Sequence, residues 1–516
     1  MLAIKCSVLS LLAMPALGAP QFPLSLIRSD AEGFGLTVEL SGDRLFVGAQ
    51  QDDTFGMDAG AVYAYDLPGT EPALTIVPDV HLPGEFFGRT MDAVGDYLVV
   101  GSNENDQAGG NAGAAFVFDA STGQQLHQLI ASDAQPTDFF GGAVATDGVH
   151  AVVGATGEDS AGSFAGAAYV YDLSTGLELH KLTGSDIDAS DRFGSSVAVD
   201  GDLVVVGAES HNDMFSGQGA VYVFDVASGQ QLLKLIPTDA HSFQRFGLWV
   251  GLDSQTIVVS ATEDNELGSD AGAVYVFDRQ SGQQLHKLTE PGGGANSTFG
   301  AGLDVQDGEA MIGALTPSSG SATAYLFDLT TGTLRFEQPA PISDFGGAYS
   351  NRFSFDGERV AMGSSVPRLV TVQLALERIG ARYCSPAPLN SNGLSGRIEV
   401  LGSTSVDDDL VRLGAIGLPQ FQLGYFLTSQ TQGFLPNPAG SQGNLCLGGA
   451  IGRYNLQLQT VGFLGTFAIE VDLSQAPVTP SVPILAGETW NFQAWYRDAN
   501  PGPTTNLTDA VSLTLR

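Results

Sequence analysis

The feature that most constrains this fold is a phrase that returns at a fixed spacing. It opens with a Phe-Gly pair and ends in a short apolar run, as in FGSSVAVDGDLVVVGA from Phe193. A seventh pair, Phe345-Gly346, comes slightly early. The other six pairs stand 53 residues apart, at Phe34, Phe87, Phe140, Phe193, Phe246 and Phe299. A constant period of this length indicates repeated units that stack on their neighbours.

Each repeat predicts four strands. In the fourth copy, SSVAV leads into Asp200-Gly201, a two-residue hairpin signal. LVVVGA, GAVYVFD and QQLLKLI follow, separated by a polar loop and by a turn at Ser228-Gly229. Four antiparallel strands repeated seven times predict an all-β fold, a seven-bladed β-propeller over residues 20–378.

Recurring residues in the repeat have expected structural roles. We expect each Phe of the six pairs to fill the apolar gap between adjacent blades, and the glycines to let neighbouring backbones approach. The seventh copy lacks a fourth strand, whereas PLSLIRS before Phe34 supplies a spare one. We therefore expect the N-terminal strand to pair in the last blade and close the ring, which protects an open sheet edge.

The phrases FGSSVAVDGDLVVVGA and GQGAVYVFD resemble the FG-GAP repeat in its bacterial extracellular form, of which the integrin α-subunit head is a distant, seven-bladed relative. The resemblance implies a secreted or surface propeller used for binding or adhesion. Integrin-type repeats often carry a calcium loop, Asp-x-Asp-x-Asp-Gly, in the first hairpin of a blade. Hairpins as short as Asp200-Gly201 leave no room for it, so the resemblance does not imply calcium there.

A second phrase, FDASTGQQLHQL from Phe118, is similar to a turn of quinoprotein propellers. Those blades usually carry a Trp in the fourth strand. Here Trp249, Trp490 and Trp495 do not recur with the period. A quinone-dependent enzyme is therefore kept only as an alternative.

The first 18 residues read as a secretory signal peptide. Lys5 precedes an apolar run that is too short to span a membrane, and small residues stand before Gly18. This predicts a secreted or cell-surface protein, and no later run predicts a membrane span. Cleavage leaves Cys384 and Cys446, an even pair that predicts one disulfide, with a free catalytic thiol as the alternative.

The formal net charge of -36 disfavours nucleic acid and anionic lipid as partners. It favours cations and basic partners, although solubility explains it equally well. We expect a monomer that binds an extracellular protein or a glycan.

Acidic and amide residues recur in the loops that follow the second strand of each repeat: Asp53, Asp106, Asp159, Asn212 and Asn265. Further carboxylates precede the Phe-Gly pairs, and both loop types should emerge on one face of the disc. Turn formation is one explanation, because these side chains bond nearby backbone amides. Calcium binding is another, since Ca²⁺ takes six to eight oxygen ligands. Asp186, Asp188 and Asp191 are the densest set and the candidate calcium ligands; a basic or carbohydrate partner is the third explanation.

No nucleophile-and-base motif or metal-protease motif occurs, so we expect a protein without enzymatic activity. His127, His180 and His286 share one place in the fourth strand and are expected on the blade surface. The rival hypothesis is a propeller enzyme, polysaccharide-cleaving or quinone-dependent, with residues such as Asp188, His211 or His241 at the channel mouth. A purely structural envelope protein is a third possibility.

From about residue 381 the period is lost, and alternating runs predict a small β-sandwich over residues 381–516. The phrases YCSPAPLNSNG, NLCLGGAIGRY and NFQAWYRD resemble a C-terminal module of exported proteins from planctomycete-type bacteria, for which no activity is implied. Trp490, Trp495 and Tyr496 are either core residues or a platform for sugar stacking.

Overall fold

The structure of the chain is a computed structural model. It forms two compact units: the first comprises Met1–Thr333 and Gln338–Leu374, and the second comprises Leu334–Glu337 and Ala375–Arg516. The predicted signal peptide and the Phe345-Gly346 pair lie outside the described residues. The structure describes residues 24–28, 30–316, 321–340, 353–356, 359–364, 369–374, 381–384, 390–391, 396–402, 411–416, 418–419, 421–436, 438, 443–454, 457–461, 467–478, 481–498 and 504–516.

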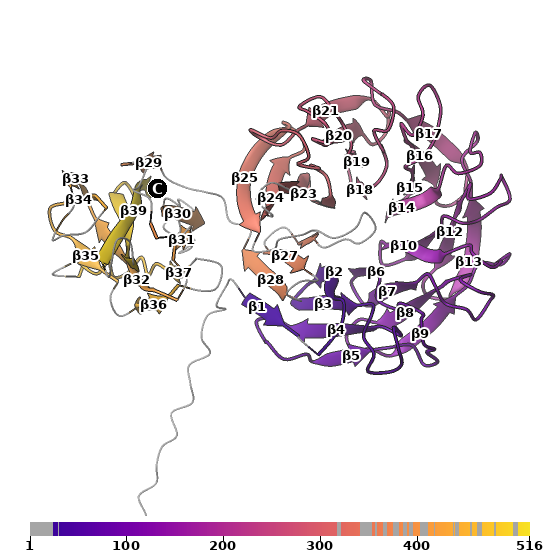
Figure 1. Ribbon diagram of the computed structural model, residues 1–516, viewed down its shortest axis with the longest axis horizontal. Helices are drawn as coiled ribbons and strands as arrows, with labels where there is room; N and C mark the ends of the chain where they lie inside the picture. Colours follow the sequence, from indigo (N-terminus) through magenta and orange to yellow (C-terminus); the bar gives the residue numbers. More distant parts are fainter. Residues whose placement is uncertain are drawn as a thin grey trace, which may run out of the picture. The chain divides into compact units, whose positions relative to one another are not determined.

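Seven four-stranded antiparallel sheets surround a central axis in the first unit, as the repeat predicts (Figure 1). Blades 1 to 3 consist of β2 (Phe34–Ser41), β3 (Arg44–Ala49), β4 (Ala61–Asp66), β5 (Leu74–Ile76); β6 (Thr90–Val94), β7 (Tyr97–Ser102), β8 (Ala114–Asp119), β9 (Gln125–Leu129); and β10 (Phe140–Thr146), β11 (His150–Ala155), β12 (Ala167–Asp172), β13 (Leu177–Leu182). Blades 4 to 6 consist of β14 (Phe193–Asp200), β15 (Leu203–Ala208), β16 (Ala220–Asp225), β17 (Gln231–Leu235); β18 (Val250–Leu252), β19 (Thr256–Ala261), β20 (Ala273–Asp278), β21 (Gln284–Leu288); and β22 (Gly302–Gln306), β23 (Glu309–Thr316), β24 (Ser321–Asp328), β25 (Thr333–Ala340).

Blade 7 is built from both ends of the repeat region. It contains β26 (Phe353–Phe355), β27 (Arg359–Ser364), β28 (Leu369–Leu374) and, as its outer strand, β1 (Leu24–Ile27). Strand β1 runs antiparallel to β28, with Leu24 opposite Val372. The spare N-terminal strand therefore closes the ring.

The Phe of each of the six evenly spaced Phe-Gly pairs is fully buried. Phe193 lies in an apolar cluster with Val152 of blade 3 and Val206 of blade 4, so the cluster joins two blades. Its ring centroid is 5.5 Å from that of Tyr222, in an edge-on contact. Phe34, Phe87, Phe140 and Phe246 lie in equivalent clusters that join successive blades.

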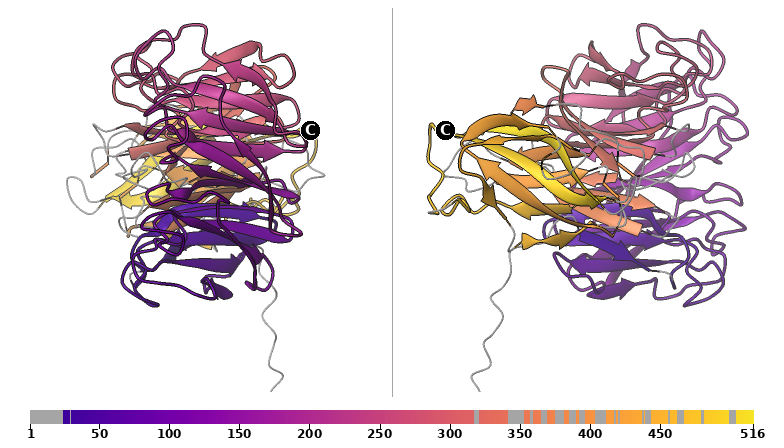
Figure 2. Two further views of the ribbon diagram at one scale, coloured as in Figure 1. Left: turned by 90° about the vertical axis from the view of Figure 1, so that its right-hand side faces the viewer. Right: turned by 60° about the vertical axis from the view of Figure 1, so that its left-hand side comes forward.

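Glycines allow the blades to meet. A Cβ on Gly207 of blade 4 would lie 2.1 Å from the carbonyl oxygen of Gly247 in blade 5, a separation that no side chain tolerates. The hairpin between β14 and β15 is as short as predicted, because Asp200 pairs directly with Leu203. Figure 2 shows the propeller from the side. The described residues form strands and contain no helix that could cross a membrane.

The second unit is a β-sandwich, as predicted, built around a core that includes Trp490, Tyr496 and Phe426. A larger sheet has the order β29-β39-β38-β32-β35 with β36 beside β32, and a three-stranded sheet has the order β30-β31-β37. A separate hairpin joins β33 to β34. The bounds are β29 (Ala381–Tyr383), β30 (Arg397–Gly402), β31 (Val411–Ile416), β32 (Leu423–Ser429), β33 (Thr431–Leu435), β34 (Leu445–Gly448), β35 (Gly452–Arg453), β36 (Gln459–Thr460), β37 (Phe467–Glu470), β38 (Thr489–Asp498) and β39 (Thr504–Thr514).

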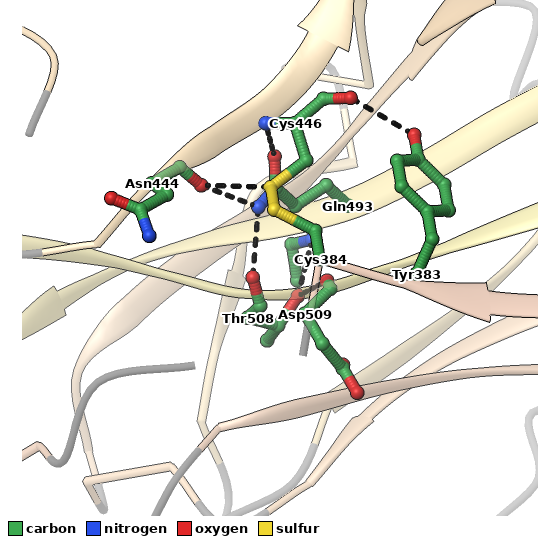
Figure 3. The surroundings of a disulfide bond; sticks show 8 residues. Tyr383, Cys384, Asn444, Cys446, Gln493, Thr508 and Asp509 are labelled. Atoms are coloured by element: carbon green, nitrogen blue, oxygen red, sulfur yellow. Dashed lines mark hydrogen bonds between the residues drawn. A yellow bond between two sulfur atoms is a disulfide. The ribbon is translucent and has the colours of Figure 1, made fainter. Parts of the chain in front are cut away.

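A disulfide joins Cys384, directly after β29, to Cys446 in β34 (Figure 3). The amide of Cys446 donates a hydrogen bond to Oε1 of Gln493, and the Tyr383 hydroxyl donates to the Cys446 carbonyl. The bond and these contacts attach the β34 hairpin to the larger sheet.

Candidate binding surface

Two kinds of loop lie side by side on one face of the propeller. In blade 1, the amide of Gly84 donates to the carbonyl of Met57 at 2.9 Å, and the amide of Phe86 donates to the carbonyl of Asp58 at 3.1 Å. Equivalent bonds recur in the following blades. We call this surface the loop face; it comprises residues 50–60, 103–113, 156–166, 209–219 and 262–272, and residues 77–86, 130–139, 183–192, 236–245 and 289–298.

The periodic Asp and Asn residues of the loop face close their own loops. Asp53 accepts a hydrogen bond from the amide five residues later, that of Asp58, at 2.8 Å. The same bond is made by Asp106, Asp159, Asn212 and Asn265. Turn formation therefore accounts for this ring of side chains.

The three candidate calcium ligands point to different partners. Asp186 accepts from Lys234 Nζ at 2.6 Å and from the Tyr222 hydroxyl at 2.8 Å. Asp191 contacts His211 Nδ1 at 2.7 Å, whereas Asp188 is exposed and bonds the amide next to it. Within the described residues, no three His, Cys, Asp or Glu side chains are arranged to hold a metal ion. This arrangement does not fit Ca²⁺ at the three residues, and calcium binding by the loops stays a prediction.

Blades 3, 4 and 5 each contain one partly buried lysine, called here the internal lysine, which the sequence analysis did not identify. These lysines are Lys181, Lys234 and Lys287, which stand one period apart in the outer strands. Their regular spacing could have identified them from the sequence. Lys181 Nζ lies 2.6 Å from Asp133 and 2.9 Å from Glu158, which belong to two different loops. Burial alone would lower the pKa of Lys287, but its carboxylate hydrogen bonds raise it above the usual value. Each lysine thus pairs with carboxylates from both loops of its own blade.

Blade 2 replaces this cluster with neutral residues. Gln128 stands at the lysine position and donates to Gln107 at 2.6 Å. Asn105 stands where blade 3 has Glu158, and it donates to the buried carboxylate of Glu85 at 2.7 Å. The loop carboxylates of blades 1 and 2 are therefore not matched by a lysine of this kind.

A cavity of about 520 Å³ lies on the propeller axis, lined by the inner strands of all seven blades. Six acidic residues line it, and three of them share one place in the repeat: Glu39, Asp92 and Asp304. Each follows the Phe of its Phe-Gly pair by five residues, where Ala145, Ala198 and Gly251 stand in blades 3 to 5. The sequence period could have identified this set. Asp188 and His211, weighed above for the channel mouth, do not line the cavity.

Burial raises the pKa of these carboxyl groups. The pKa of Asp92 rises to about 6 and that of Asp304 to about 7. Burial and the charges of Asp92 and Asp304 hold the pKa of Glu39 well above its usual value. Asp92 accepts the amide of Thr146, and Asp304 accepts the amide of Phe355, each at 2.6 Å. Both bonds connect an inner strand to the next blade, so a structural role explains these two residues.

Other candidates have structural positions. His180 and His286 contact a backbone carbonyl in the turn of the next blade, at 3.0 and 3.2 Å. Trp490 and Tyr496 are core residues of the sandwich. The Trp495 ring contacts the Tyr425 ring in a tilted arrangement, with the two ring centroids 4.9 Å apart. The three aromatic residues do not form one exposed platform.

Comparison with known families matches the FG-GAP repeat to residues 28–65, 74–118, 124–171, 177–224 and 230–277. After the first, each match begins at or near the outer strand of one blade and ends in the third strand of the next. No curated protein matches the sequence. A solved chain of Kuenenia stuttgartiensis hydrazine synthase is similar at 15% identity and a TM-score of 0.44, over 70% of this chain and 98% of that one. At that level of likeness, nothing about function is inferred from it.

Proposed function

The chain is an FG-GAP β-propeller protein, and we propose that it is an exported, non-enzymatic protein that binds a partner through its loop face. The observation that carries the proposal is the composition of that face. Paired loops from successive blades present exposed apolar side chains among carboxylates. These exposed residues are Phe55, Met57, Val80, Leu82, Phe164, Met214, Phe215, Phe243 and Leu267. Clustered apolar exposure of this kind marks interaction sites.

An extracellular location supports a binding role. FG-GAP propellers and disulfides are both typical of extracellular proteins, and the second unit carries a disulfide. The predicted signal peptide supports export of the protein to the medium or to the cell surface. The partner is an extracellular protein or a glycan, bound by a monomer, with Ca²⁺ as a candidate aid.

One observation favours a second candidate function. Carboxyl groups with raised pKa, gathered in a cavity, resemble the acid and base groups of glycan-cleaving enzymes. Glu39 and Asp304 would then be the groups that exchange protons with the substrate. Because these groups lie in the channel, the experiment below also tests this alternative.

The test uses the mature protein on glycan and peptide arrays, with calcium and with chelator. Met214→Ser combined with Phe243→Ser removes apolar surface from the loop face. Leu179→Ser combined with Leu232→Ser removes similar surface from the outer strands and serves as the matched control. Loss of array binding only in the loop variant supports the proposal.

Turnover of a glycan substrate by the wild-type protein would contradict the proposal. If that turnover were abolished by Asp304→Asn, the activity would belong to the channel. Array binding that both double variants retain in full would also contradict a role for the loop face.

A further inference from the structure

One sector of the loop face differs from the rest. Residues 50–60 and 77–86 expose Met57 by 71%, Val80 by 67%, Leu82 by 45% and Phe55 by 40%. This is the densest group of exposed large apolar side chains in the described part of the loop face. Single exposed apolar residues are ordinary, but a group of four in two loops indicates a contact surface.

These side chains form one patch because their loops are tied together. The Phe55 and His81 rings meet edge-on, with centroids 5.3 Å apart. The amide of Gly84 donates to the Met57 carbonyl at 2.9 Å. A Cβ on Gly56 would lie 3.4 Å from the side chain of Pro83. The two loops therefore present a continuous surface.

The same sector carries carboxylates without lysine partners. The two loops contain Asp52, Asp53, Asp58, Asp79 and Glu85 and neither Lys nor Arg. Val80 occupies the position that Asp133 occupies one period later. Asp133 is the first of the aspartates that bind the internal lysines, so this sector has an apolar residue where the blades with an internal lysine have that carboxylate. Arg28, which lies 4.1 Å over the Tyr63 ring of blade 1, is paired with Asp30. Asp53 and Asp79 are exposed beside the apolar patch.

We propose that this sector docks a basic amphipathic segment of a partner protein, which rests on the proposed loop-face function. Apolar side chains of the segment would cover Met57, Val80 and Leu82. Lys or Arg residues of the segment would meet Asp53 and Asp79. Neither loop supplies a Lys or Arg to these two carboxylates, so the complementary charge would come from the segment. An uncharged glycan would leave these carboxylates unmatched.

The test uses a synthetic helical peptide of Leu and Lys as the probe, and a Leu and Glu peptide of the same pattern as its control. Fluorescence anisotropy at physiological salt measures the dissociation constant. Phe55→Ser combined with Met57→Ser should raise it roughly ten-fold. Leu179→Ser combined with Leu232→Ser, on the outer strands, should leave it unchanged. The Leu and Glu peptide should not bind.

Equal affinity of the wild type and the Phe55 and Met57 variant would overturn the proposal, because binding would then depend on net charge alone. Concentration-dependent dimerisation of the wild type, lost in that variant, would overturn it in favour of a second copy as the occupant. These exposed substitutions should leave the melting temperature unchanged, which confirms folding. Array binding that depends on Met214 and Phe243, without peptide binding at Met57, would reject this inference and keep the proposed function.

Discussion

Leu26 of β1 lies opposite Val370 of β28, so the two ends of the repeat region pair within one blade. Leu26 is 2% exposed, whereas its neighbour Ile27 is 65% exposed. We expect Leu26→Ala to lower the free energy of unfolding of the propeller by about 2–4 kcal/mol, as for other buried leucines. Urea unfolding measures this change. Ile27→Ala is the matched control and should change the value by less than about 0.5 kcal/mol. Equal effects of the two substitutions would mean that β1 does not hold the ring closed.

Lys234 is expected to stabilise blade 4 through Asp186 and His211. Lys234→Ala removes the cation from partly buried carboxylates and should lower the free energy of unfolding by about 1–3 kcal/mol. Thermal and urea unfolding measure the loss. The triple variant Asp186→Val, His211→Asn, Lys234→Gln introduces the residues that blade 2 has at these positions. It should recover part of the unfolding free energy that Lys234→Ala loses. A triple variant that is less stable than Lys234→Ala would contradict this explanation.

The calcium prediction is tested with the same variant. If the loops bind Ca²⁺, about 2 mM Ca²⁺ raises the melting temperature above that in matched Mg²⁺. Because Lys234 Nζ lies between Asp186 and His211, we expect the calcium-specific rise to be larger in Lys234→Ala than in the wild type. No rise in either protein would show the calcium prediction to be wrong.

The channel carboxyl groups should make stability depend on pH. The pKa of Asp304 is about 7 and that of Asp92 about 6 in the folded protein, above their values in an unfolded chain. The folded state therefore binds these protons more tightly. Their stabilising contribution is complete below a pH of about 4 and is lost as the pH rises through about 7.

Asp304→Asn removes this contribution while it keeps an oxygen for the amide of Phe355. The difference in unfolding free energy between wild type and variant should shrink or reverse between pH 4.5 and 7.5, as measured by urea unfolding at each pH. Ser196→Ala on another inner strand, which does not titrate, is the control. A difference that is constant with pH would show that the pKa of Asp304 is not raised.

The disulfide should stabilise the second unit alone. Its cysteines are 62 residues apart, and closing a loop of that length contributes about 4 kcal/mol. We expect reductant, or Cys384→Ser, to lower the melting transition of the sandwich and to leave that of the propeller unchanged. Differential scanning calorimetry resolves the two transitions. A matched fall of both would indicate that the units unfold together.

Repetition made most of the fold predictable from sequence. Six Phe-Gly pairs at a constant spacing define the blades, and the missing seventh outer strand matched the spare segment at Leu24–Ile27. The close approach at Gly207 also follows, because the equivalent Gly48, Gly101 and Gly154 meet the backbone of the next blade in the same way.

The site was less predictable because side-chain partners come from different loops. Asp186, Asp188 and Asp191 look like a cation site in sequence, yet Lys234, more than 40 residues later, supplies the cation for Asp186. The period groups Glu39 with Asp92 and Asp304, but only the closed ring shows that the three side chains line one cavity. The apolar patch near Met57 breaks the period, and sequence alone did not show which loop tips are exposed.

The central claim is that a partner binds the loop face. Hydrogen exchange of the mature protein, with and without the strongest array ligand, tests it most directly. We expect slower amide exchange on binding in residues 50–60, 77–86 and the equivalent loops of blades 3 to 5. Slower exchange confined to the channel-lining strands around Asp92 and Asp304, or to the second unit, would contradict the claim.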